Sequence, residues 1–139
     1  MKVFVYFVGK PRDLHANALA EEYLKRCARY LRCEMREVQP ERFDPWLKHP
    51  SGLKILLDPA GKSFDSTRFA ELIAKAEQES RALVFLVGGA SGLPKQWRER
   101  PGVLLSLSAM TFPHELARVM LAEQIYRALA TLRGHPYPK

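Results

Sequence analysis

The sequence predicts an α/β protein, in which a parallel-type sheet is flanked by helices. Short β-branched runs alternate with longer segments of helical periodicity along the 139 residues. The run ALVFLVGG (82–89) is apolar on both faces, which is typical of a strand at the centre of a parallel sheet. The length suits one domain, residues 1–139, with a core of its own.

Five strands are predicted from β-branched and apolar runs. The first, KVFVYFVG, ends in a turn, and the second, CEMREVQP, is stopped by Pro40. The third, LKILLD, is closed by PAGKSFDS, and the fifth, VLLSLSAM, follows the central run. The predicted strands span residues 2–9, 33–40, 53–58, 82–89 and 103–110.

Three helices are predicted from apolar residues at helical spacing. Asp13 is a suitable N-cap for the first, Ser66 or Asp65 caps the second, and Pro113 opens the third. Residues 41–52 contain prolines and a glycine, so we expect a short helix or an irregular loop there. The predicted helices span residues 14–31, 66–79 and 113–132.

The last helix changes its apolar face along its length. Leu116, Val119 and Met120 share one face in the first half. In the second half the apolar positions rotate to Ile125, Ala128, Leu129 and Leu132. We expect such a helix to pack on its own sheet at one end and on another surface at the other. A second subunit and a loop over the sheet are the two alternatives.

Composition narrows the class of protein. Lys and Arg number 22 against 15 Asp and Glu, a net charge of +7 that favours a polyanionic partner. No apolar run approaches the roughly 20 residues of a membrane span, and the first strand does not resemble a signal peptide. Cys27 and Cys33 are too few for a disulfide framework and form no metal-ligand pattern. We expect a cytoplasmic protein that needs neither membrane nor metal.

Basic residues gather in three places. Lys25, Arg29 and Arg32 would form one stripe on a helix, and Lys10 and Arg12 lie in a loop. A third group follows the glycine-rich segment at Lys95, Arg98 and Arg100. Each group alone is compatible with solvated surface, but together they favour a surface that contacts phosphate.

Small residues follow three strands where parallel sheets bind ligands, outside the carboxyl ends. The segments 58–61, 88–92 and 106–111 should lie together and form a pocket. In GGASG (88–92), the glycines have no side chains, so backbone groups could approach a ligand closely. This segment is neither a Walker loop nor the GxGxxG fingerprint, and a tight strand-to-helix turn is the alternative.

Four segments together resemble one known family. They are LLDPAGK (56–62), LVGGASGL (86–93), LSLSAMTFPHELARVMLAEQIYRA (105–128) and HPY (135–137). In order and spacing they resemble the RlmH-type (YbeA-like) methyltransferases of the SPOUT superfamily. The likeness covers essentially the whole chain and is densest from Leu86 onward.

The resemblance implies a fold, a reaction and partners. Such proteins form a SPOUT α/β knot with a C-terminal trefoil knot, and they are homodimers. They use S-adenosylmethionine to methylate N3 of a pseudouridine in 23S rRNA of the large subunit, within the ribosome. The family's cofactor contacts fall on Leu57, Gly88, Leu107, Ser108, Ala109, Met110, Thr111 and Phe112.

Two departures from the family pattern bear on catalysis. Ala90 and Ser91 stand where the family usually has Pro-Glu, and the tail ends in Tyr137-Pro138-Lys139 where Tyr-His and a basic residue are usual. A catalytically impaired module that binds the ribosome or rRNA is therefore the alternative function. An enzyme that binds a different nucleotide is a third hypothesis, which the absent Walker lysine disfavours.

The proposed reaction needs help with a proton. N3–H of a pseudouridine is weakly acidic, so a nearby base or polarising cation would assist. Lys139 is a candidate phosphate contact, Glu123 is expected to pair with Arg127, and His114 to have a surface or capping role. The catalytic candidates, for each of which a structural or RNA-positioning role is the alternative, are His135, Tyr137 and Arg118.

Overall fold

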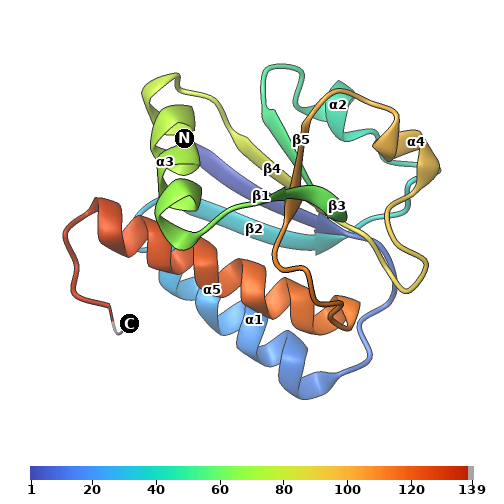
Figure 1. Ribbon diagram of the computed structural model, residues 1–139, viewed down its shortest axis with the longest axis horizontal. Helices are drawn as coiled ribbons and strands as arrows, with labels where there is room; N and C mark the ends of the chain where they lie inside the picture. Colours follow the sequence, from blue (N-terminus) through green and yellow to red (C-terminus); the bar gives the residue numbers. More distant parts are fainter. Residues whose placement is uncertain (138–139) are drawn as a thin grey trace.

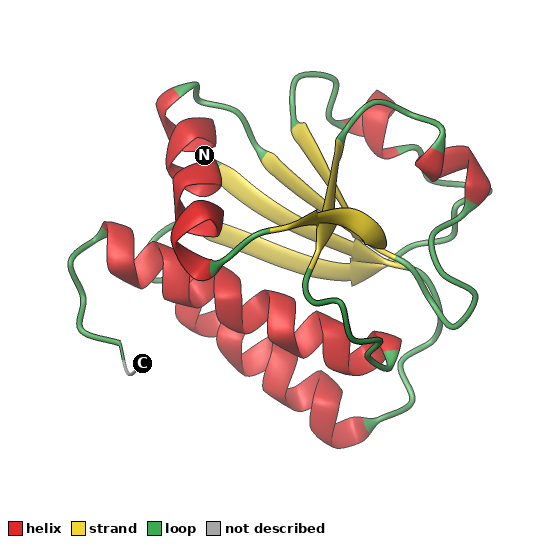
Figure 2. Cartoon of the chain, viewed as in Figure 1, coloured by secondary structure: helices red, strands yellow, loops and turns green. Residues whose placement is uncertain are grey.

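A computed structural model describes residues 1–137, and Pro138 and Lys139 lie outside the described residues. Its centre is a five-stranded parallel sheet in the order β2-β1-β4-β3-β5 (Figure 1, Figure 2). The central strand β4 is buried along its whole length, which confirms the α/β prediction. The strands are β1 (Lys2–Phe7), β2 (Arg32–Glu37), β3 (Leu53–Ser63), β4 (Leu83–Val87) and β5 (Val103–Ser106).

Three long helices cover one face of the sheet. They are α1 (Leu14–Cys27), α3 (Ser66–Gln78) and α5 (His114–Leu132). Val5 and Phe85 of the sheet meet Ile73 of α3 in the main core, and Leu121 and Ile125 of α5 join them there. The helices α1 and α5 run side by side below the sheet in Figure 1. The core on this face contains more buried residues than the core on the opposite face.

Two short helices and their loops pack on the opposite face. They are α2 (Pro45–Lys48) and α4 (Lys95–Arg98). Tyr6, Leu56 and Leu86 of the sheet pack there with Trp97, and Phe43 lies against them. This second core draws on β1, β3 and β4 rather than on β2. The β2 end of this face is therefore left more open than the helical face.

β3 runs on past Asp58, where the sequence predicts that the strand ends. Leu57 and Lys62 both pair with Leu105 of β5, so the residues between them form a bulge. The bulged residues lie outside the β3–β5 ladder, so their N–H groups need not donate to the neighbouring strand. Pro59, which has no N–H, is therefore tolerated there. The predicted strand-end loop is thus an interruption within a longer strand.

The first helix ends earlier than predicted. α1 stops at Cys27, and the chain continues as a turn in which the Tyr30 amide donates to the Cys27 carbonyl at 2.9 Å. The predicted basic stripe is therefore wrong. Lys25 is helical, Arg29 lies in the turn and Arg32 begins β2.

The first half of α5 has one buried and one exposed side. Val119 is buried against α1, so it does not share a face with Leu116 and Met120 as predicted. Leu116 and Met120 stay 47% and 46% exposed in the single chain. Arg118, although charged, is only 1% exposed. The outward apolar face of α5 therefore consists of Leu116 and Met120.

Candidate functional site

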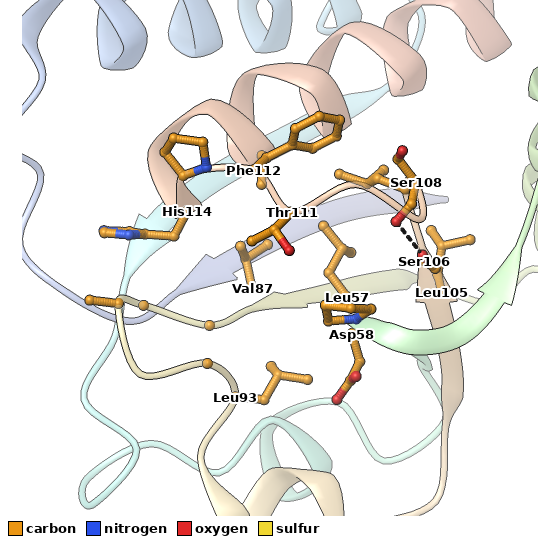
Figure 3. Close-up of a pocket in the computed structure, with 18 of the residues that line it drawn as sticks. Leu57, Asp58, Val87, Leu93, Leu105, Ser106, Ser108, Thr111, Phe112 and His114 are labelled. Carbon is orange, nitrogen blue, oxygen red and sulfur yellow. Dashed lines mark hydrogen bonds between the residues drawn. The ribbon is translucent and has the colours of Figure 1, made fainter.

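A cavity of about 520 Å³ opens at the carboxyl ends of the strands. The bulge of β3, the segments after β4 and β5, and the first turn of α5 surround it (Figure 3). This arrangement confirms the predicted convergence of the three small-residue segments. The lining residues are 57–59, 87–93, 98, 105–108, 110–114 and 117.

The glycine-rich loop after β4 is shaped by its own backbone. A Cβ on Gly88 would lie 2.5 Å from the carbonyl oxygen of Gly92, closer than side chains approach. Gly92 has φ +82°, a conformation that L side chains rarely adopt. Its amide donates to the carbonyl of Gly89 at 3.0 Å. The loop therefore needs these glycines to close on itself, a reason that the sequence alone does not reveal.

The loop between β5 and α5 forms another wall of the cavity. The buried Ser106 hydroxyl donates to the Ser108 carbonyl at 2.9 Å, drawn as a dashed line in Figure 3. The Met110 amide donates to the Ser108 hydroxyl at 3.0 Å. Such side-chain-to-backbone bonds hold a loop in one turn. This turn places Leu107 and Thr111 at the cavity.

Every predicted cofactor-binding residue except Ala109 lines the cavity. Leu57 and Phe112 are half-buried at its walls, and Gly88 is buried at the end of β4. Ala109 is exposed in the loop after β5. The cavity thus brings the predicted set together, and the role of each residue in it stays a prediction.

Three ionisable side chains at the cavity, Asp58, Arg98 and His114, are absent from the predicted set. Asp58 accepts a hydrogen bond from the Ala60 amide at 2.8 Å, and its second oxygen lies 3.4 Å from Nε of Arg98. His114 lines the cavity, beyond the surface or capping role predicted for it. An acid at a strand end is a signal that points to Asp58. No local signal places Arg98 or His114 at the cavity.

Arg118 lies beneath the first turn of α5 and does not line the cavity. Its Nη2 donates to Oδ1 of Asn17 at 2.6 Å, and its guanidinium lies 3.9 Å from the centre of the Phe7 ring. Its Nε and Nη1 are buried and have no hydrogen-bond partner within the described chain. The geometry therefore places Arg118 as a buried cation that supports α5 and the end of β1.

Glu115 compensates part of this buried charge. Its Oε1 accepts from the backbone amides of Arg12 and Asp13 at 2.8 and 3.1 Å, and from Asn17 Nδ2 at 2.8 Å. The Arg12 amide, then Asn17 and Asp13, hold the pKa of Glu115 at about 2. This carboxylate ties the loop before α1 to the start of α5.

The tail lies at the other end of α5. His135 is exposed and its ring centre lies 6.5 Å from that of Tyr30. Tyr137 donates to Glu123 Oε2 at 3.0 Å, and burial, followed by its bonds to Tyr23 and Glu123, raises the pKa of the Tyr137 hydroxyl. Neither His135 nor Tyr137 lines the cavity of its own chain.

The predicted ion pair on α5 is confirmed. Arg127 Nη2 lies 2.6 Å from Glu123 Oε2 at spacing i, i+4. The same carboxylate receives the Tyr137 hydroxyl, and the Arg127 guanidinium lies 5.0 Å from the centre of the Tyr137 ring. The pair thus holds the tail against α5.

The arrangement suits binding of a small organic ligand. Among residues 1–137, no three His, Cys, Asp or Glu side chains are grouped so that they can hold a metal ion. No helix in that part of the chain has the length and apolar character needed to cross a membrane. The fold and the cavity define an α/β protein that binds a ligand outside the carboxyl ends of a parallel sheet.

Sequence comparisons identify the family. A family model described as "Predicted SPOUT methyltransferase" matches residues 1–138. A protein of Solibacter usitatus named "Ribosomal RNA large subunit methyltransferase H" is 64% identical over 137 residues, which cover 99% of each chain. The chain therefore belongs to the SPOUT methyltransferases, in the family of ribosomal RNA large subunit methyltransferase H. The resemblance noted in the sequence is confirmed.

Solved structures share the fold. The structure of a probable methylase family protein from Haemophilus influenzae Rd KW20 superposes with a TM-score of 0.64 at 9% identity, covering 99% of this chain and 72% of that one. An AdoMet-bound rRNA methyltransferase from Sinorhizobium meliloti gives 0.53 at 14% identity, covering 91% and 56%. At such identities the likeness shows the fold alone.

Proposed function

We propose that this chain transfers a methyl group from S-adenosylmethionine to N3 of a pseudouridine in 23S rRNA of the large ribosomal subunit. The observation that carries the proposal is the 64% identity, over 99% of both chains, to a protein named ribosomal RNA large subunit methyltransferase H. The net charge of +7 suits an RNA substrate. We further propose that residues 1–139 form one domain, knotted near its C-terminus, that acts on ribosomes in the cytoplasm.

The cavity fits S-adenosylmethionine in size and in chemistry. Its volume of about 520 Å³ lies within the usual range for small-ligand sites. Leu57, Leu107 and Phe112 supply apolar wall for a flat base, and the Asp58 carboxylate is available to hydroxyl or ammonium groups. Main-chain groups of the loops 88–92 and 107–111 supply further donors and acceptors. These residues would hold the cofactor.

Methyl transfer depends mainly on the alignment of the accepting nitrogen with the methyl group. Bound S-adenosylmethionine supplies an activated methyl group on its sulfonium. The chain's task is to hold the accepting nitrogen in line with that group and to exclude water, which by itself accounts for much of such a rate enhancement. The narrow turn at 106–110, fixed by Ser106 and Ser108, would keep the site rigid.

The proton on N3 must leave during the reaction. Tyr137 is a poor base because its raised pKa keeps the hydroxyl protonated at neutral pH, so its role is to donate a hydrogen bond. His135 is exposed and is the better candidate base. Arg118 is buried and does not line the cavity, so we propose that it positions α5 and does not polarise the substrate.

The position of the tail supports a homodimer. α5 has 19 residues, so it separates the tail from the cavity of the same chain by about 28 Å. A tail that takes part in catalysis must therefore reach the cavity of a second copy. Leu116 and Met120 on the exposed side of α5, and Leu14, 83% exposed at the start of α1, offer apolar surface for that copy.

Methyl transfer to ribosomes tests the proposed function. Ribosomes that lack the modification are incubated with labelled S-adenosylmethionine, and the product is mapped by mass spectrometry. We expect one methyl group on N3 of a single large-subunit pseudouridine. Cofactor and ribosome binding without transfer would instead favour the catalytically impaired module. Sedimentation of Met120→Glu, with the exposed Leu47→Glu as control, tests the dimer: only the first should become monomeric.

A further inference from the structure

The register of β1 and β2 places basic and aromatic residues side by side. Lys2 pairs with Arg32, Phe4 with Glu34, and Tyr6 with Arg36. Side chains alternate across a strand, so these six share one face. The residues between them, such as Val5 and Met35, pack on the helical side. The six therefore face away from α1 and α5.

These residues line a hollow of about 580 Å³ together with Lys48 and His49 of the α2 region. We call it the β1–β2 surface, defined by Lys2, Phe4, Arg32, Arg36, Lys48 and His49. It includes the amino-terminal ends of β1 and β2, whereas the cavity lies at the carboxyl ends of β3, β4 and β5. The β1–β2 surface is therefore a separate feature of the molecule.

Aromatic rings form a fixed platform in this hollow. The Phe4 and His49 rings lie 4.3 Å apart between centres, and the Tyr6 hydroxyl is 2.7 Å from His49 Nε2. The Arg36 guanidinium lies 5.5 Å from the Tyr6 ring centre and 5.2 Å from that of Phe43. Rings that are already held in place lose little entropy when a flat ligand stacks on them.

The charge around the platform is strongly positive. Lys2, Arg32, Arg36 and Lys48 are all exposed. Among the described residues that line the hollow, the one acid is Glu34, whose Oε2 lies 3.1 Å from Arg32 Nη2. Behind the platform, the buried Lys54 donates to the His49 carbonyl. Burial, followed by Lys48 and Lys54, lowers the pKa of His49.

We infer that the β1–β2 surface binds RNA, with phosphates on Lys2, Arg32, Arg36 and Lys48 and an unpaired base against Phe4 and His49. A positive groove that carries aromatic rings is the usual platform for single-stranded nucleic acid, and RNA is read mainly at loops and unpaired bases. An acidic protein would match the charge but would not use the rings. The inference rests on the proposed function, because the RNA is the ribosomal substrate.

The position of the β1–β2 surface indicates its role in the reaction. It lies outside the cavity, so it contributes affinity for the substrate and takes no part in methyl transfer. Loss of its cations should raise the KM for ribosomes and leave kcat and cofactor affinity unchanged. Each lost phosphate contact should also lower the slope of log K against log salt by about 0.7 to 0.9.

The test uses the double variant Lys2→Gln/Lys48→Gln. Its matched control is Lys25→Gln/Lys75→Gln, which removes two exposed lysines from the last turns of α1 and α3. We measure the KM and kcat with unmodified ribosomes, binding of an rRNA fragment at several salt concentrations, and cofactor affinity. A third variant, Phe4→Leu, removes the ring and keeps the apolar bulk.

We expect the Lys2/Lys48 variant to bind RNA roughly tenfold more weakly, with a salt slope lower by about 1 to 2. Phe4→Leu should weaken binding several-fold without changing the slope, because stacking is not electrostatic. An equal loss in the Lys25/Lys75 control, or unchanged binding in both β1–β2 variants, would overturn the inference. If the wild type binds RNA through this surface but transfers no methyl group, the proposed function fails and the inference stands.

Discussion

At its first turn, α5 leaves Pro113 and joins the wall of the cavity through His114 and Ala117. At its last turn the chain bends at Gly134 and runs back to meet α1, where Tyr137 approaches Tyr23. The first end adjoins loops that are each shaped by hydrogen bonds within the loop, such as those of Ser106 and Ser108. The second end depends on contacts between side chains far apart in sequence.

The difference between the two ends of α5 suggests that the cavity end and the tail end have different roles. The cavity end is held by short-range turns, such as the Ser106–Ser108 bond and the closed glycine loop, so it is preformed to receive a ligand. The tail end is held by a few side-chain hydrogen bonds, among them the bond from the Tyr137 hydroxyl to Glu123. The tail can exchange these hydrogen bonds for bonds to other groups. Changes at the two ends should therefore have separable effects.

Gly88→Ala should have the largest effect, and at the cavity end alone. The new Cβ would lie 2.5 Å from the Gly92 carbonyl oxygen, so the loop cannot keep its closed shape. We expect cofactor affinity to fall at least 100-fold and the free energy of unfolding by about 3 kcal/mol. Calorimetry and urea unfolding measure the two effects.

Gly92→Ala is the matched control for that variant. Nothing lies within 4 Å of a Cβ at Gly92, so only its φ of +82° resists the change. The expected loss of stability is about 1 kcal/mol. Equal losses at Gly88 and Gly92 would contradict the steric explanation of the loop.

Arg118→Ala should destabilise the packing of the start of α5 on α1 and β1. It removes the bond to Asn17 and leaves a hole beside Phe7 in a site that is 1% exposed. We expect the free energy of unfolding to fall by about 3 kcal/mol. Arg26→Ala, which breaks an exposed pair with Glu22, should change it by less than about 0.5 kcal/mol. Similar values for both would show that burial of Arg118 is unimportant.

Glu115 predicts a pH dependence at the cavity end. Its pKa is about 2 in the folded chain against an ordinary value of 4.5. The lower folded pKa means that its contribution to stability is complete above about pH 5 and is lost as the pH falls towards 2. In Glu115→Gln the unfolding midpoint in urea should therefore fall less over this range than in the wild type. Identical curves would exclude Glu115 as a source of acid sensitivity.

Tyr137→Phe should have the smallest effect and leave the cavity end unaltered. It removes one hydrogen bond to Glu123, worth about 1 kcal/mol in the free energy of unfolding. Cofactor affinity should not change, because Tyr137 does not line the cavity of its chain. Isothermal titration checks this, and a tenfold loss of affinity would mean that the tail contributes to cofactor binding as well as to the stability of its own chain.

The sequence predicts the cavity end well because its signals are local. Strand runs, small residues after β4 and β5, and the Pro113 start of α5 can each be recognised from a few consecutive residues. The β3 bulge escapes prediction because Pro59 and Gly61 indicate a turn unless the pairing with β5 is known. The helix α4 escapes because four residues, Lys95–Arg98, are too few to show helical periodicity.

Long-range contacts explain the remaining differences. Arg118 is a polar position on an amphipathic helix, and only the packing of Phe7 and Asn17 around it shows that it is buried. The separation of His135 and Tyr137 from the cavity depends on the length and direction of α5. The β1–β2 surface depends on the register that pairs Lys2 with Arg32, which are thirty positions apart.

The central claim is that the cavity of one chain works with the tail of another. The most direct test mixes two variants that we expect to be inactive alone: Thr111→Arg, which fills the cavity from an exposed position, and His135→Ala/Tyr137→Ala, which removes the tail groups. After subunit exchange, half of the dimers are mixed and each contains one complete site, so methyl transfer should return to about a quarter of the wild-type rate. No recovery in the mixture, with dimers confirmed, would contradict the account.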